Sequence, residues 1–452
     1  MKLSDRVKDK LKKINISSLA FFAISMISIT LAWFAYTNTV SSNMNINLKS
    51  WNVRITKNNT NVNNTFSINI NDLYPGAQTF DETYTIHNDG DIAAKISYNI
   101  KSFRIFNTEY TTTNSISFAQ LERDYPFVLS FTHGSRYLAP GSTSTFNVNC
   151  QWPLDSGNNE LDTRYGQMAY VFYQQEQRFH NQNSSYQMRS GLELKIEIVI
   201  SQYIDETNSF ATDSWDTIEL AVEKGDTSKY NVGDTKTISM DVDGDGTNEN
   251  YTVRIANKST NSNCSNENYS QTACGFVVEF QDIITQKAMR ETYINVGGYP
   301  ATNVYTYLNK TLVGRLPTDI QNVLAKTRVI SGYGNNGIDT SNFTTTDNLY
   351  LLSSEEVYGI DGGGHNFYDT AHGTSQQLDY YSNNGVTYST NSLRGANLDK
   401  AIKQYNSSIS WWWLRPADSS GDGVFHAVDS GGYFCRNLAY ICDGVAPAFR
   451  IG

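Results

Sequence analysis

The chain has 452 residues, of which 39% are hydrophobic, 13% aromatic and 18% charged, with 8 Pro and 31 Gly. This composition excludes disordered and collagen-like chains, and the length suits two or three domains. The net charge is −10 overall, yet residues 1–15 carry +4, which leaves −14 for the rest. Because nucleic-acid affinity depends on lysines and arginines that replace counterions, an acidic body argues against a nucleic-acid partner.

Residues 16–36 (ISSLAFFAISMISITLAWFAY) form an uncharged stretch behind a basic segment, residues 1–15. A helix of this length spans about 30 Å, the thickness of a bilayer core. Cationic flanks stay in the cytoplasm, so the stretch predicts a single-pass membrane protein with its N-terminus inside and its body outside. Cleavage as a secretory leader, near Val40 and Ser42, is the alternative and would give a secreted protein.

Residues 44–205 show the period-two alternation of β-strands, with turn residues between the runs. The run 192–200 (LELKIEIVI) alternates apolar and charged residues, as expected for a half-exposed antiparallel strand. Long helical periodicity is not apparent there. The pattern therefore predicts an all-β domain, a β-sandwich or jelly roll.

Residues 73–100 (LYPGAQTFDETYTIHNDGDIAAKISYNI) and the membrane exit LAWFAYTNTV resemble the TasA and camelysin family of exported surface proteins. The resemblance covers about residues 30–205 and implies a jelly-roll domain of the cell surface or biofilm matrix. Some members have been linked to protease activity. This chain has no H-E-x-x-H motif or other metal-ligand helix pattern, so the protease interpretation lacks a chemical basis.

A polar bridge at residues 205–213 predicts a boundary near residue 208, followed by an α+β domain over residues 210–452. We expect a short helix or strand from Trp215, a hairpin with strands near 237–240 and 251–256, and helical segments near 305–324 and 395–405. The chain as a whole is expected to be mainly β.

Several motifs at the end of the chain resemble the DUF6273 family of exported bacterial domains. They are NLYLLSSEEVYG (348–359), QLDYY (377–381), WWWLRPADSS (411–420), HAVDSGGY (426–433) and DGVAPAFRIG (443–452). The resemblance covers about residues 215–452 and implies no settled biochemical role. The order of WWLR, alternating strands and a terminal PAFRI suggests, by fold analogy, the sheet closure of a C-type-lectin-like or formylglycine-enzyme-like fold.

Two segments have the residue types of metal sites. Asp241, Asp243, Asp245 and Glu249 are spaced like a calcium loop with glycine at position six, although position twelve is Thr252. A plain Asp/Gly hairpin turn explains the same residues, so calcium is an open cofactor assignment. His365, Asp369 and His372 are spaced like part of a metal site, but the neighbouring GGG and the lack of a further ligand favour a mobile loop instead.

Cysteine spacing leaves the disulfides open. Cys264 with Cys274, and Cys435 with Cys442, could each form a local disulfide outside the cell, whereas Cys150 stands alone.

Ligand recognition is predicted on loops between residues 418 and 443. In a strand, Trp412 would face away from its two tryptophan neighbours, so it could meet a ligand together with His426, Tyr433 and Arg436. The alternative is that these aromatic side chains complete the core.

The sequence therefore predicts a non-catalytic bacterial surface protein that presents its distal domain for binding or adhesion to an extracellular glycan or protein. A structural subunit of an extracellular matrix or fibre is the alternative. A cell-wall hydrolase is disfavoured because no recognisable pair of carboxylates is present.

Overall fold

The computed structural model describes residues 50–111, 125–359, 368–388 and 396–452. The predicted basic segment 1–15 and membrane stretch 16–36 lie outside these residues. None of the helices in the described segments combines the length and apolar character that a membrane crossing requires. The described chain is mainly β, as the alternation predicted.

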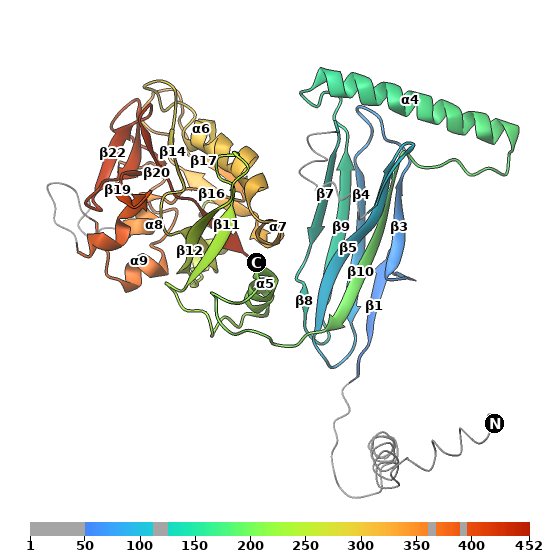
Figure 1. Ribbon diagram of the computed structural model, residues 1–452, viewed down its shortest axis with the longest axis horizontal. Coiled ribbons are helices and arrows are strands. Elements are labelled where there is room, and N and C mark those ends of the chain that lie inside the picture. The colour runs from blue at the N-terminus through green and yellow to red at the C-terminus, as the bar shows by residue number, and fades with distance from the viewer. Residues whose placement is uncertain (1–49, 112–124, 360–367, 389–395) are drawn as a thin grey trace, which may run out of the picture. The chain divides into compact units, whose positions relative to one another are not determined.

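Residues 53–202 are here called the two-sheet region, and their described part (53–111 and 125–202) contains ten strands and one long helix, which Figure 1 shows. They are β1 (Val53–Lys57), β2 (Thr60–Val62), β3 (Thr65–Ile70), β4 (Phe80–Asn88), β5 (Ala94–Ile105), β6 (Thr108–Thr111), β7 (Val128–His133), β8 (Tyr137–Leu138), β9 (Thr143–Gln151), α4 (Asn159–Gln182) and β10 (Leu192–Gln202).

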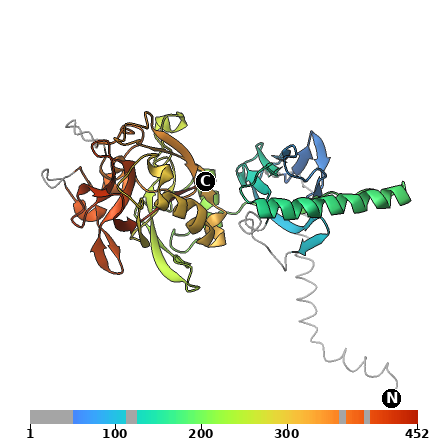
Figure 2. The same cartoon turned by 90° about the horizontal axis from the view of Figure 1, so that it is seen from above.

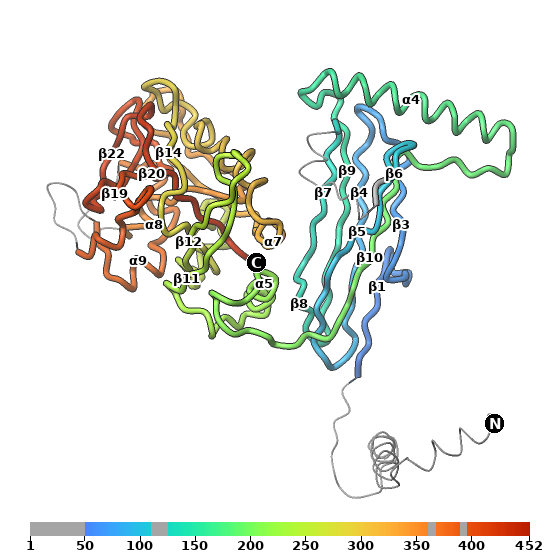
Figure 3. The backbone as a smooth tube through the Cα atoms, viewed as in Figure 1, coloured from blue at the N-terminus to red at the C-terminus, as the bar shows by residue number. Residues whose placement is uncertain are grey.

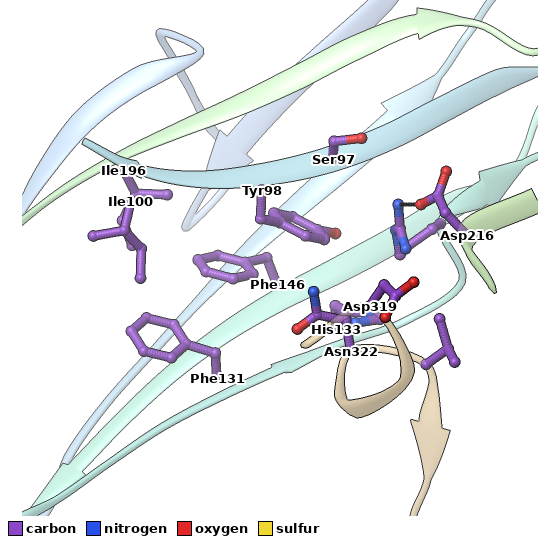
Figure 4. A pocket seen from close by; sticks show the side chains of 12 residues that line it. Ser97, Tyr98, Ile100, Phe131, His133, Phe146, Ile196, Asp216, Asp319 and Asn322 are labelled. Carbon is purple, nitrogen blue, oxygen red and sulfur yellow. Dashed lines mark hydrogen bonds and ion pairs between the residues drawn. The ribbon is translucent and has the colours of Figure 1, made fainter. Parts of the chain in front are cut away.

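One sheet has the order β2-β1-β4-β9-β7, and the other has the order β3-β10-β5-β6 with β8 beside β5. Alternate residues of both sheets, such as Ile86, Val148 and Ile196, are fully buried in one shared core. Tyr98 of β5 stacks on Phe146 of β9 across the two sheets, with ring centroids 4.6 Å apart, and both rings line a pocket (Figure 4). Period-two burial from two facing sheets is the packing of a β-sandwich.

Helix α4 contradicts the prediction that this region lacks a long helix. Its 24 residues lie across one end of the sheets (Figures 1 and 2). Asn158 caps its N-terminus, and Tyr165, Ala169, Phe172 and Glu176 form its buried stripe. Glu176 is polar, whereas Met168, Tyr170, Val171 and Phe179 lie on the exposed side of the helix. The helical period is therefore hard to recognise from hydrophobicity alone.

Residues 210–452, here called the distal region, contain many short elements. The helical ones are α5 (Trp215–Lys224), α6 (Asn303–Thr306), α7 (Thr318–Gln321), α8 (Ser354–Tyr358), α9 (Asp379–Asn383), and short 3₁₀ or π turns at Ser262–Ser265, Tyr299–Ala301, Tyr307–Leu312, Val313–Arg315 and Leu398–Ala401. The strands are β11 (Thr235–Met240), β12 (Glu249–Asn257), β13 (Val277–Phe280), β14 (Thr285–Ala288), β15 (Leu324–Ala325), β16 (Thr327–Ser331), β17 (Phe343–Asp347), β18 (Lys403–Tyr405), β19 (Ser408–Ser410), β20 (Trp412–Ala417), β21 (Val424–Val428), β22 (Phe434–Leu438), β23 (Cys442–Val445) and β24 (Ala448–Ile451).

Two five-stranded sheets organise this region, with orders β11-β12-β13-β24-β15 and β14-β23-β20-β21-β22. The last strand, β24, pairs between β13 and β15, so the chain end returns to strands formed far earlier in the sequence (Figure 3). The sheet that contains β20 is covered on both faces. Trp413 packs in one hydrophobic core and Trp412 in another.

Local predictions for this region have mixed outcomes. The β11–β12 hairpin and the helix at Trp215 are confirmed. The helix expected near 395–405 is wrong, because the described part holds only a 3₁₀ turn followed by β18. Cys264 and Cys274 form a disulfide, whereas Cys435, Cys442 and Cys150 are free thiols.

Candidate functional site

The loop of residues 418–423, here called the Asp418 loop, joins β20 to β21 and is held by its own hydrogen bonds. The Asp418 carboxylate accepts from the Ser420 backbone N–H at 2.8 Å and from the Ser420 hydroxyl at 2.6 Å. From the neighbouring segment, the buried amide of Asn295 donates to the Gly421 carbonyl at 2.8 Å. These bonds give the loop one defined conformation although its residues are small and polar.

A buried polar chain continues from this loop into the domain. The second carboxylate oxygen of Asp418 lies 3.4 Å from His426 Nε2, and His426 Nδ1 lies 2.8 Å from the Ser354 hydroxyl. All three side chains are fully buried. With its proton on Nε2, a neutral imidazole can accept a hydrogen bond from the Ser354 hydroxyl at Nδ1 and direct its Nε2–H toward the Asp418 carboxylate. Burial alone would raise the pKa of Asp418, but the His426 contact and the Ser420 bonds hold it below its usual value.

Helix α8 places two glutamates of opposite behaviour beside this chain. Glu356 receives two hydrogen bonds of 2.7 Å from the buried Arg415 guanidinium, and this charge holds its pKa below the usual value despite burial. From the described residues, the Glu355 carboxyl accepts two backbone N–H bonds, from Gly373 at 3.1 Å and from Ser375 at 3.3 Å. Burial first, then the negative charges of Glu356 and Asp369, raise the pKa of Glu355 to about 8. One carboxyl is therefore ionised at neutral pH and its neighbour is largely protonated.

Three exposed side chains surround the Asp418 loop at the surface. The Tyr293 ring lies directly against the Gly423 backbone, where a Cβ would be only 2.6 Å from the ring. Arg436 contacts Asp418 and Ser420, and its guanidinium lies 4.9 Å from the centre of the Tyr368 ring. Tyr293 and Tyr368 are 52% and 47% exposed as residues, and the Arg436 side chain is 42% exposed. We call Tyr293, Tyr368, Arg436 and the Asp418 loop the tyrosine face.

The structure removes two predicted ligand-binding residues from the surface. Trp412 is completely buried and donates its indole N–H to the Ala401 carbonyl at 2.9 Å. It does point away from Trp413, but the second core covers that face of the sheet as well. His426 is also completely buried, so neither side chain has accessible surface for a ligand.

The other two predicted residues lie at different places. Arg436 is on the tyrosine face. Tyr433 is in the β21–β22 turn, at the opposite end of β21 from the Asp418 loop, a separation of about 16 Å for a five-residue strand. The loops between 418 and 443 therefore do not gather at one end of the hairpin, because alternate connections of antiparallel strands lie at opposite ends.

Sequence reasoning missed Tyr293, Tyr368 and Ser354. The two tyrosines stand in polar loops without periodicity, and tertiary contacts alone bring them to the Asp418 loop. Ser354 reaches His426 across 72 residues of sequence. Its only sequence signal is the capping box of α8, which begins at Ser353.

The predicted calcium loop places three carboxylates together. Ligand oxygens of Asp241, Asp243 and Asp245 lie within 4.8 Å of one another, a group that does not include Glu249. Asp241 accepts a backbone bond from Gly246 at 2.9 Å, and this bond, followed by other contacts that include Arg315, lowers its pKa. Arg315 is thus a built-in cation beside the loop, and calcium binding stays a prediction.

Other predicted metal residues are only partly described. His365 lies outside the described residues, whereas Asp369 and His372 are within them. The hydroxyl, imidazole and carboxylate of Ser354, His426 and Asp418 are the groups of a nucleophilic triad. All three are fully buried in the described structure, and their contacts link the Asp418 loop to α8.

Residues 276–452 match the family described as "Domain of unknown function (DUF6273)". The match covers the sheet that carries the tyrosine face and begins after the β11–β12 hairpin. No curated protein and no solved structure matches the chain.

Proposed function

We propose that the chain is a non-catalytic bacterial cell-surface protein whose distal region binds an extracellular ligand on the tyrosine face. The observation that carries the proposal is the exposure of Tyr293, Tyr368 and Arg436 around a loop held rigid from beneath. Tyrosine and arginine are the side chains most enriched where binding energy is concentrated. A preorganised loop also lowers the entropic cost of association.

Burial of the reactive groups supports a binding role over hydrolysis. A catalytic serine must lie within hydrogen-bond distance of its base and must also be reachable by the substrate. Ser354 and His426 have no exposed surface. Glu355, whose raised pKa would suit a general acid, is almost completely buried too.

The proposed placement at the cell surface rests on the sequence. Residues 16–36 would anchor the chain with residues 1–15 in the cytoplasm, or would be cleaved to release it. The two-sheet region, as a TasA-like jelly roll, would act as a spacer. The distal region would be the presented DUF6273 domain with a C-type-lectin-like closure. A matrix-subunit role would instead require the two-sheet region to assemble into filaments.

A binding experiment with matched arginine variants tests the proposal. Residues 44–452 are purified, labelled and titrated onto intact bacterial cells and extracted extracellular matrix. Arg436→Ala should weaken attachment by about tenfold or more. Arg54→Ala is the control, because Arg54 is a similarly exposed, ion-paired arginine of the two-sheet region. Tyr433→Ala should bind normally, since Tyr433 is at the other end of the hairpin.

Melting temperatures of the variants separate binding from folding. Equal attachment of wild type and Arg436→Ala at equal melting temperature would refute the tyrosine face as the site. Filaments from residues 44–205 alone would favour the matrix-subunit alternative.

A further inference from the structure

Two tyrosine rings on this face are fixed before any ligand arrives. Tyr293 is seated on Gly423, a position where a side chain would collide with its ring. The Tyr368 carbonyl accepts a 2.6 Å bond from the Ser419 N–H, and its ring packs beside the Arg436 guanidinium. Both rings nevertheless remain about half exposed. A ligand can stack on rings that are already fixed and exposed without paying to order them.

The polar groups between the rings offer both donors and acceptors. Ser420 and Asp422 are exposed on the loop, and Arg436 adds its guanidinium donors. Tyr293 lies against Gly423, and Tyr368 lies beside Arg436, which contacts Ser420. The chain from Ser420 to Gly423 spans at most about 11 Å, so the polar strip between the two rings is short.

Charge on the face disfavours an anionic ligand. Arg436 is its cation, and it already contacts the ionised Asp418. Asp422 adds a further carboxylate at the surface. The face therefore has no net positive charge with which to bind a phosphate, sulfate or carboxylate. A neutral ligand with several hydroxyl groups can instead form hydrogen bonds with both the donors and the acceptors of the face.

The apolar part of the face is also small. A stable protein–protein interface needs roughly 800 Å² per partner, with a continuous apolar centre. Here the apolar surface consists of the two tyrosine rings and of the exposed Ile294 beside Tyr293, with polar loop between the rings. A pyranose has this same division, with an apolar C–H face and a rim of hydroxyl groups.

We propose that the tyrosine face binds a neutral pyranose oligosaccharide, with sugar faces stacked on Tyr293 and Tyr368 and hydroxyl groups bonded to Ser420, Asp422 and Arg436. This inference rests on the proposed function and names its ligand class.

The test uses the purified full-length chain on a printed array. The array holds neutral oligosaccharides of glucose, galactose, mannose and N-acetylhexosamines, together with their sulfated and sialylated counterparts. The wild type should bind at least one neutral oligosaccharide. Tyr293→Ala and Tyr368→Ala should each weaken that binding about tenfold, and the Phe variants should retain most of it because stacking needs only the ring.

The control is Tyr170→Ala, which removes an exposed tyrosine from helix α4 and should change nothing. Binding of anionic oligosaccharides alone would overturn the inference, and so would unchanged binding by both alanine variants. The wild type could bind nothing on the array and still attach to cells, with attachment weakened by Arg436→Ala and by protease treatment of the cells. That result would overturn the saccharide inference in favour of a protein ligand and would leave the proposed function standing. A wild type that neither binds the array nor attaches to cells would refute both the inference and the proposed function.

Discussion

Replacing Glu355 by glutamine should stabilise the distal region, most strongly at high pH. The Glu355 side chain is buried, receives two backbone N–H bonds and stands beside the ionised Glu356. Its pKa is about 8 in the folded chain, against the ordinary value of 4.5 for a glutamate. Glutamine has the same shape as the protonated acid, so it keeps the backbone bonds and removes the cost of ionisation.

The sign and size of the effect follow from linkage. Because folding raises this pKa, the folded state prefers the protonated form, and wild-type stability falls as pH rises from about 4.5 to about 8. At about 1.4 kcal/mol per pH unit, Glu355→Gln should gain less than about 1 kcal/mol at pH 5, about 3 kcal/mol at pH 7 and about 5 kcal/mol above pH 8.

Urea unfolding of the wild type and Glu355→Gln at pH 5, 6, 7 and 8, followed by tryptophan fluorescence, measures this difference. Glu176→Gln in the two-sheet region is the control of opposite sign. Glu176 is buried against Arg189, which helps to hold its pKa low despite the burial, so its replacement should destabilise at neutral pH. A stability gain for Glu355→Gln that is constant from pH 5 to pH 8, or a loss at pH 8, would refute the reasoning.

Three further predictions concern the chain's organisation. Protease added to intact cells should remove the body and leave a small fragment with residues 2–13, and a mature protein that begins near residue 43 in the medium would contradict the anchor. Residues 210–452 expressed alone should melt cooperatively, because each described hydrophobic core lies within one region. If residues 210–452 and residues 44–205 each aggregate when expressed alone, but not when joined, this prediction is wrong. Millimolar calcium should raise the melting temperature of the wild type but not of Asp243→Ala, and an equal response would exclude this loop.

Local patterns in the sequence predicted the strands well. In the two-sheet region, the alternation at residues 192–200 became β10, with every second side chain buried. The hairpin around Asp241 also followed from its turn residues. Helix α4 was missed because its buried stripe includes Glu176, whose burial depends on Arg189 and Tyr186 rather than on hydrophobicity.

The candidate site depended on contacts that no local pattern reveals. Alternation correctly sent Trp412 and Trp413 to opposite faces, but it could not show that a second core covers the face of Trp412. That core includes Tyr358, Leu378 and Tyr381, which come from separate earlier segments. A strand buried on both faces has no free face on which Trp412 could meet a ligand.

The buried polar chain explains why Arg436 has a special place at the tyrosine face. Inside the domain, Glu356 is neutralised by Arg415, and protonation keeps Glu355 uncharged at neutral pH. Asp418 accepts two hydrogen bonds from Ser420 and lies 3.4 Å from both His426 and Arg436, and of these groups the Arg436 guanidinium is the permanent cation. A ligand that drew Arg436 away would leave a buried carboxylate poorly paired, at a cost that rises with its burial. Ligands that add hydrogen bonds to Arg436 while it stays beside Asp418 avoid that cost, and this favours uncharged hydroxyl groups over anions.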